Sequence, residues 1–196
     1  RNGIVPTPGS LADNPMRTRA ILKRGLNVIA AARPQIVLDL GCGAGRDTQT
    51  LSHLPNVKVI GIDWDHDILT TAPSRPNVYY LRADVTRLPL TTRAVGASYN
   101  FGLLQVLSHT GDAPLRKFLR ELARVLRLDA PAIIGTLADF RRKNERERSL
   151  TGAEVSKAMR GLLILRELIG TMDAENDERQ TRYWYIHAIP ISNDES

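Results

Sequence analysis

Residues 37–46 read VLDLGCGAGR, and this stretch decides the fold. An apolar run typical of a buried strand leads directly into Gly41, Gly43 and Gly45, which stand at every second position. Glycines allow positive φ angles and let a backbone approach a ligand without an intervening side chain. The stretch therefore predicts a strand, a turn and the start of a helix, with room for a ligand at the turn. A tight turn without a ligand is the alternative explanation.

The spacing of the glycines bears on which ligand the turn would take. A dinucleotide-binding turn has the pattern G-x-G-x-x-G. Here Arg46 occupies the sixth position of that pattern, and the third glycine comes one residue earlier, at Gly45. Asp39, which precedes the turn, would place a negative charge near the ligand. Such a charge suits a cationic amino-acid group better than a pyrophosphate.

Short apolar runs alternate with amphipathic segments along the rest of the chain. We expect buried strands at residues 36–40, 57–62, 78–81, 95–99 and 132–137, with helices near 45–54, 65–71, 103–107 and 113–128. One more helix starts at Pro15, and another starts at the capping box of Thr151 and Glu154. Residues 162–172 and 180–191 are expected to form an antiparallel hairpin. The pattern predicts an α/β fold, a Rossmann-like doubly wound sheet that is mostly parallel and ends in this hairpin.

Acidic residues stand at the ends of successive expected strands. Asp39 belongs to the first strand, Asp63 ends the second and Asp84 follows the third. The carboxyl ends of parallel strands meet at one edge of the sheet, where α/β proteins bind ligands. Asp63 can accept hydrogen bonds from both ribose hydroxyls, and Asp84 can accept one from an adenine amino group. Each acid singly could be a helix cap or a loop residue, but together they favour a nucleoside site.

These residues resemble the class I S-adenosylmethionine-dependent methyltransferases, in particular the group that includes the menaquinone and ubiquinone methyltransferases. Val37–Gly45 is similar to the family's first motif, Asp63 to its ribose-binding acid, and Asp84-Val85 to its adenine-binding position. The segment Tyr99–Leu104 resembles the part that lines the methyl-donor pocket. The resemblance implies a strand order of 3-2-1-4-5-7-6 and S-adenosylmethionine as the cofactor.

The resemblance covers roughly residues 35–137 and shows two departures. Ala94 stands where an acidic residue is often found, and residues 128–131 replace a glycine-rich turn. His109 is the candidate catalytic residue by family analogy, and a loop histidine without a catalytic role is the alternative. No metal is expected. The cofactor-binding residues that the resemblance implies are Asp39, Gly41, Cys42, Gly43, Gly45, Asp63, Trp64, Asp84, Val85, Asn100 and Phe101.

Length and composition are those of an ordinary globular protein. The 196 residues, 42% hydrophobic and 24% charged, suit a single domain over residues 14–196, preceded by a flexible segment or lid over residues 1–13. No apolar run approaches the roughly 20 residues that span a bilayer, so a membrane protein is not expected. The single cysteine excludes an internal disulfide framework. Cytoplasm is the expected compartment.

The net charge of +6 does not decide which kind of molecule the protein binds. Nucleic acid is a possible partner on charge alone, but the basic residues are spread thinly, and the run Arg141–Arg148 interleaves Glu145 and Glu147. We expect a methyltransferase with an unidentified acceptor, a small molecule being favoured over RNA or protein. The alternative is a non-catalytic adaptor that keeps the fold and activates a partner. The intact glycines and the three carboxylates favour the enzyme. Oligomeric state is not predicted.

Overall fold

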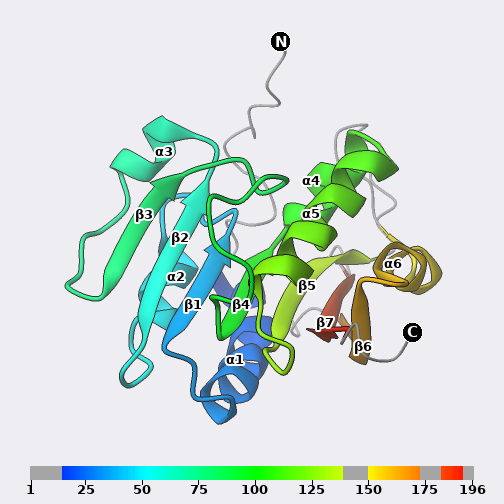
Figure 1. The fold of residues 1–196 in the computed structure, drawn as a ribbon, viewed down its shortest axis with the longest axis horizontal. Coiled ribbons are helices and arrows are strands. Elements are labelled where there is room, and N and C mark those ends of the chain that lie inside the picture. Colours follow the sequence, from blue (N-terminus) through cyan, green and yellow to red (C-terminus); the bar gives the residue numbers. More distant parts are fainter. Residues whose placement is uncertain (1–14, 139–149, 173–181, 192–196) are drawn as a thin grey trace.

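The computed structural model describes residues 15–138, 150–172 and 182–191, and in this part the chain forms a seven-stranded sheet (Figure 1). The strand order is β3-β2-β1-β4-β5-β7-β6, with parallel pairing from β3 through β5 and antiparallel pairing of β5 with β7 and of β7 with β6. The predicted fold class and strand order are confirmed. The strands are β1 (Ile36–Leu40), β2 (Lys58–Asp63), β3 (Val78–Arg82), β4 (Ala97–Phe101), β5 (Ala132–Ala138), β6 (Leu163–Met172) and β7 (Arg182–Pro190).

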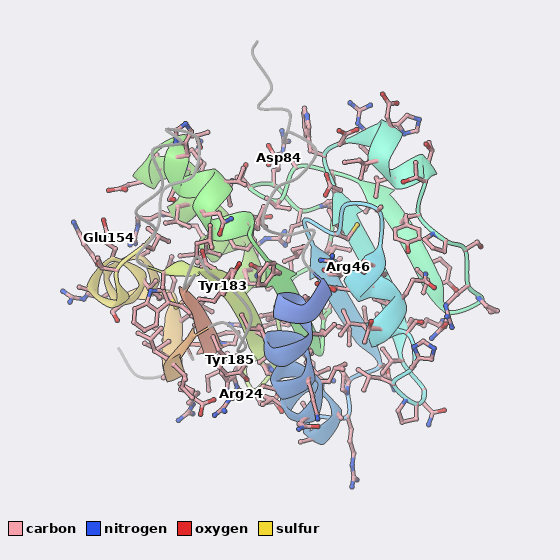
Figure 2. The ribbon with its side chains drawn as sticks, turned by 180° about the vertical axis from the view of Figure 1, so that it is seen from behind. Arg24, Arg46, Asp84, Glu154, Tyr183 and Tyr185 are labelled. Atoms are coloured by element: carbon pink, nitrogen blue, oxygen red, sulfur yellow. The ribbon has the colours of Figure 1, made fainter. Side chains whose placement is uncertain are left out.

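Helices cover both faces of the sheet. In Figure 1, α4 and α5 lie in front of the sheet, and Figure 2, seen from behind, shows α1 and α2 on the opposite face. Side chains of successive strand residues point to opposite faces, so each strand contributes to two apolar cores. Leu38 and Ile134 belong to the core under α4 and α5, whereas Val37 and Ile133 belong to the core under α1. The helices are α1 (Pro15–Ala31), α2 (Arg46–Leu51), α3 (His66–Thr70), α4 (Leu103–His109), α5 (Asp112–Val125) and α6 (Gly152–Met159).

The helix starts that the sequence predicts are mostly found. α1 begins at Pro15. α6 begins with the predicted capping box, in which the Glu154 N–H donates to Thr151 Oγ1 at 3.2 Å and the Thr151 N–H donates to Glu154 Oε2 at 2.8 Å. α2 starts one residue later than expected and already ends at Leu51. The expected N-terminal lid over residues 1–13 and the charged run Arg141–Arg148 lie outside the described residues.

The expected position of β4 is wrong by two residues. The strand occupies residues 97–101 rather than 95–99. Val95 makes only an isolated bridge with Leu126, and Gly96 packs so closely on Pro34 that an added Cβ would lie 2.8 Å from Pro34 Cβ. Because the strand starts later, Asn100 and Phe101 belong to its carboxyl end and do not follow it.

One contact joins α1 to the C-terminal hairpin. Arg24 of α1 forms an ion pair with Glu167 of β6, and its guanidinium lies 5.0 Å from the centroid of the Tyr185 ring on β7 (Figure 2). The contact connects segments that are 143 residues apart in the sequence. Among the described residues, no helix is long and apolar enough to cross a membrane.

Candidate functional site

The glycine turn is anchored to the end of β2. The N–H groups of Gly41 and Cys42 both donate to the Ile62 carbonyl, at 2.8 and 3.1 Å. The next N–H in the loop, that of Gly43, donates to Asp63 Oδ2 at 2.8 Å. These bonds fold the loop back across the carboxyl edge of the sheet, beside the last residue of β2.

The three glycines of the loop serve different purposes. All have positive φ angles, +73° at Gly41, +52° at Gly43 and +77° at Gly45, which L-residues rarely adopt. A Cβ on Gly45 would lie 2.2 Å from the hydroxyl of Tyr80, so Gly45 is required by packing within the protein. A Cβ on Gly43 would find only Ile68 Cγ2, at 4.0 Å. The open side of Gly43 therefore leaves room that a ligand can occupy.

Asp63 is held in place by main-chain donors at both of its carboxylate oxygens. Its Oδ2 accepts from Gly43 N–H, and its Oδ1 accepts from Asp65 N–H at 3.0 Å. Asp65 in turn caps α3 by accepting from the N–H groups of Asp67 and Ile68, at 2.9 and 3.2 Å. A carboxylate oxygen has two lone pairs, so each oxygen of Asp63 can accept one further hydrogen bond. The partly buried carboxylate is thus fixed in position and can still receive two ribose hydroxyls.

An aromatic face and a carboxylate lie exposed beyond the ends of β2 and β3. The Trp64 side chain is 64% exposed, and the Arg82 guanidinium lies 5.7 Å from its ring centroid. Asp84 is exposed, and its Oδ1 accepts from Thr86 N–H at 2.8 Å in a tight turn (Figure 2). Val85 is buried next to it. Exposed aromatic area beside a hydrogen-bond acceptor is suited to a planar base such as adenine.

The sequence predicts that Asp39 places a negative charge near the ligand, but the structure shows a buried side chain. Its side chain is only 2% exposed, and Thr48 Oγ1 of α2 donates to its Oδ2 at 2.6 Å. Burial, and secondarily the nearby Asp47 carboxylate, raise the pKa of Asp39 to about 8, so the group is largely protonated at neutral pH. The sequence places Asp39 at the correct strand end, but it does not reveal that the residue is buried. In this structure Asp39 joins β1 to α2 through Thr48.

The comparisons with known proteins agree with this geometry. Residues 37–129 match the family model described as a methyltransferase domain. Malonyl-[acyl-carrier protein] O-methyltransferase of a Marinomonas species is 30% identical over 125 residues, which are 61% of this chain and 44% of that protein. The matched residues include the glycine loop, Asp63 and Asp84, and the match supports a class I S-adenosylmethionine-dependent methyltransferase domain. The narrower resemblance to the menaquinone and ubiquinone group stays a prediction.

Further similarities to this methyltransferase domain are partial in length or in sequence identity. Trans-aconitate 2-methyltransferase of Yersinia pestis is 36% identical over 59 residues, which are 29% of this chain and 23% of that protein. The chain thus spans less than half the length of both curated relatives. Among solved structures, a 1,6-didemethyltoxoflavin-N1-methyltransferase from Burkholderia thailandensis has a TM-score of 0.70 at 16% identity, covering 92% of this chain and 83% of that chain. A methyltransferase from Aquifex aeolicus has a TM-score of 0.66 at 21% identity, covering 91% and 95%. These structures share the fold.

The structure places Asn100 and Phe101 on opposite faces of the methyltransferase sheet. Asn100 is fully buried toward the α4 face, and neither amide atom has a hydrogen-bond partner among the described residues. Phe101 lies on the α1 face, where its ring packs over Gly135 and its centroid is 5.5 Å from that of Tyr183. The sequence predicts both residues for the cofactor pocket, but adjacent residues of a strand cannot face the same side.

His109 is the last residue of α4 and is exposed. The sequence predicts it just after this helix. α4 starts after Gly102, at the carboxyl edge of the sheet, so a helix of this length takes His109 about 10 Å away from that edge. Nothing in the described part of the chain holds the imidazole near the glycine loop. Within the described residues, no group of three or more His, Cys, Asp or Glu side chains could bind a metal.

Sequence reasoning missed two residues that shape the site. Tyr80 of β3 fills the space beneath the loop, since its ring would be 2.8 Å from an added Cβ at either Gly45 or Gly61. Gln105 of α4 reaches across to β5, where its Oε1 accepts from Leu137 N–H at 3.0 Å. Tyr80 falls in a strand with only one fully buried residue, and Gln105 falls in a short helix, so neither has a local pattern that marks it.

Proposed function

We propose that this chain is an enzyme that binds S-adenosylmethionine and transfers its methyl group to a small-molecule acceptor. The observation that carries the proposal is the pairing of Gly43 with Asp63. An open glycine with positive φ is hydrogen-bonded to a partly buried carboxylate at the end of the adjacent strand. This pairing brings a space for the cofactor's amino-acid part next to an acceptor for its ribose.

The other predicted residues fit a cofactor lying along the carboxyl edge of the sheet. Gly41–Gly45 would pass beneath the amino-acid part, and Asp63 would accept from the ribose hydroxyls. Trp64 would offer its exposed ring to the adenine, whose amino group would donate to Asp84. Asp39 would act indirectly, by holding α2 and the loop in place through Thr48.

Methyl transfer from a sulfonium mainly requires the protein to align the acceptor with the methyl group. Bound S-adenosylmethionine supplies an electrophilic methyl group on a sulfonium. The acceptor's lone pair forms the new bond to the methyl carbon while the carbon–sulfur electron pair returns to sulfur, so the residues around it mainly orient the acceptor in line. A general base is needed only when the acceptor must lose a proton. An acceptor that is already ionised needs none, and this fits the position of His109 at the exposed end of α4.

Two observations favour a small acidic acceptor. The named substrates of the curated relatives, a malonyl group and trans-aconitate, are carboxylic acids. The net charge of +6 attracts anions over long range.

Three basic residues of α5 are exposed on the outer side of that helix: Arg116, Lys117 and Arg120. Arg116 Nη1 donates to the Ala158 carbonyl of α6 at 3.3 Å, so this residue lies on the α6 side of α5.

Asp63→Ala is expected to weaken binding of S-adenosylhomocysteine about 10- to 100-fold without unfolding the domain. The ribose hydroxyls would lose a charged acceptor worth about 1.5–3 kcal/mol. Titration calorimetry of the folded variant measures the effect. Asp67→Ala is the matched control, because Asp67 is an exposed acid four residues along, in α3. Unchanged affinity in Asp63→Ala would remove Asp63 from the site.

The same titration separates the enzyme from the adaptor. A purely structural adaptor does not need the cofactor, whereas an enzyme must bind it. A wild-type protein that shows no heat of binding with S-adenosylhomocysteine would therefore favour the adaptor and contradict the proposal.

Cys42 offers a second test, because it is the single cysteine of the sequence and lies in the glycine loop. Burial, together with Asp39 and Asp63 nearby, raises the pKa of its thiol, so alkylation by a maleimide at pH 7 should be slow. We expect S-adenosylhomocysteine to slow it further by covering the loop, which mass spectrometry follows as the modified fraction against time. The unfolded protein gives the unprotected rate. Equal rates with and without ligand would place the ligand elsewhere.

A further inference from the structure

β5 extends beyond the end of β4, so its last residues have no main-chain partner on β4. The Gln105 side chain accepts a hydrogen bond there instead. The last main-chain bond between the two strands runs from Gly102 N–H to the Gly135 carbonyl, at 2.9 Å. The chain then turns at Gly102, with φ +79°, and enters α4. The next main-chain donor along this side of β5 is Leu137 N–H. It donates to Oε1 of the Gln105 side chain at 3.0 Å.

This bond fixes the orientation of the Gln105 amide. Because Oε1 accepts from a main-chain N–H, Nε2 must point the other way and present its two donors. Nε2 lies 3.7 Å from the position that a Cβ on Gly102 would occupy. The Gln105 side chain is nearly buried, at 6% exposure. The donor therefore faces the turn at the carboxyl edge of the sheet.

Three buried polar side chains without partners, Ser98, Asn100 and Thr136, lie on this face of the sheet, and the latter two lie nearest its carboxyl edge. Asn100 of β4 pairs in register with Ile134 of β5, and Thr136 follows Ile134 by two residues, so both point toward α4. Both side chains are fully buried, and none of the Asn100 amide atoms or Thr136 Oγ1 has a hydrogen-bond partner in the described part of the chain. Buried polar groups without partners are destabilising, so their clustering in an otherwise apolar core indicates that something else satisfies them.

We propose that Asn100, Gln105 and Thr136 form an acceptor subsite that binds a carboxylate group of the substrate. The inference rests on the proposed function and adds the residues that recognise the acceptor. All three side chains can donate hydrogen bonds, and a carboxylate only accepts them. Gln105 lies outermost, beside the turn at Gly102, and contacts the carboxylate first, whereas Thr136 and Asn100 lie deeper along the strands. Each donor that bonds the carboxylate would form a charge-assisted hydrogen bond, which is roughly twice as strong as one between neutral groups.

The test uses malonate as the probe and malonamide as its uncharged counterpart, both added to the wild-type protein saturated with S-adenosylhomocysteine. We expect malonate to bind and to raise the melting temperature, and malonamide to bind at least about tenfold more weakly. Gln105→Glu keeps an oxygen for Leu137 N–H but replaces the donor with a negative charge. It should weaken malonate binding at least about tenfold and leave the affinity for S-adenosylhomocysteine within about threefold. Gln35→Glu, at an exposed residue before β1, adds the same charge at the opposite edge and should bind malonate like the wild type.

Thr136→Val provides the second variant, should the buried glutamate of Gln105→Glu prevent folding. Replacing a hydroxyl that has no protein partner by a methyl group should leave the melting temperature of the ligand-free protein unchanged or higher. It should nevertheless weaken malonate binding severalfold, which a merely structural threonine would not do. The proposal is overturned if malonate fails to bind the wild-type complex, if malonamide binds equally well, or if a folded variant of Gln105 or Thr136 binds malonate as the wild type does. Failure of the proposed function is distinct, because the wild type would then not bind S-adenosylhomocysteine at all.

Discussion

Gly43→Val is expected to abolish detectable binding of S-adenosylhomocysteine in a protein that still folds. In the ligand-free protein the space beside Gly43 is open, because an added Cβ would find its nearest neighbour only at 4.0 Å. The added Cβ itself therefore creates no clash inside the protein, and the φ of +52° costs about 1–3 kcal/mol of stability. The valine side chain would, however, fill the room proposed for the cofactor's amino-acid part. Calorimetry for binding and thermal unfolding for stability measure the two effects separately.

Gly161→Val is the matched control for this substitution. Gly161 follows α6, has a φ of +74°, and an added Cβ there would meet nothing within 4 Å. The control variant should lose a similar amount of stability and keep its affinity for S-adenosylhomocysteine. Folded Gly43→Val protein with wild-type affinity would show that Gly43 serves only the turn.

Asp39→Asn is expected to make the protein more stable at alkaline pH and to flatten its pH dependence. The pKa of Asp39 is raised to about 8 by burial and by Asp47, whereas an unfolded aspartate titrates near 3.9. Between these two values the native state holds a proton that the unfolded state has lost. Raising the pH through this window therefore lowers the free energy of unfolding of the wild type, by up to about 1.4 kcal/mol per pH unit. Asparagine removes the titration and keeps an oxygen for the Thr48 hydroxyl.

Urea unfolding of both proteins at pH 5, 6.5 and 8 measures this difference. The free energy of unfolding of Asp39→Asn should exceed that of the wild type by an amount that grows with pH. At about 1.4 kcal/mol per pH unit, this difference should be several kcal/mol larger at pH 8 than at pH 5. Asp47 also has a pKa raised by burial and is present in both proteins, so it contributes to the titration that they share. Parallel curves for the two proteins would mean that Asp39 is ionised in the native state across this range. A weaker affinity of the variant for S-adenosylhomocysteine would show that the wild type retains the acid for binding at a cost in stability.

The three acids at successive strand ends illustrate how burial alters one residue type. Asp39 is buried and largely neutral, Asp63 is partly buried and held by two main-chain donors, and Asp84 is exposed in a tight turn. The sequence predicts their common location at one edge of the sheet. Their different surroundings follow from what the loop, α2 and α3 place over each one.

Most of the fold could be predicted from the sequence because its signals are local. The glycines of residues 41–45, the capping box at Thr151 and the alternation of apolar runs with amphipathic segments each act within a few residues. The strand order followed from the family resemblance and is confirmed. The position of β4 was predicted two residues too early, because Val95 has the apolar character of a strand residue but pairs only with Leu126.

The sequence by itself determined the sheet, the glycine turn and the edge at which the acids gather. Only the tertiary structure decided which side chains face one another there. It placed Phe101 against Tyr183, brought Gln105 to Leu137 across 32 residues, and buried Asp39 against Thr48 of α2. The physical reason is that strand and turn propensities depend on neighbours along the chain. Burial, hydrogen-bond satisfaction and pKa depend instead on groups that only the packing of distant segments brings together.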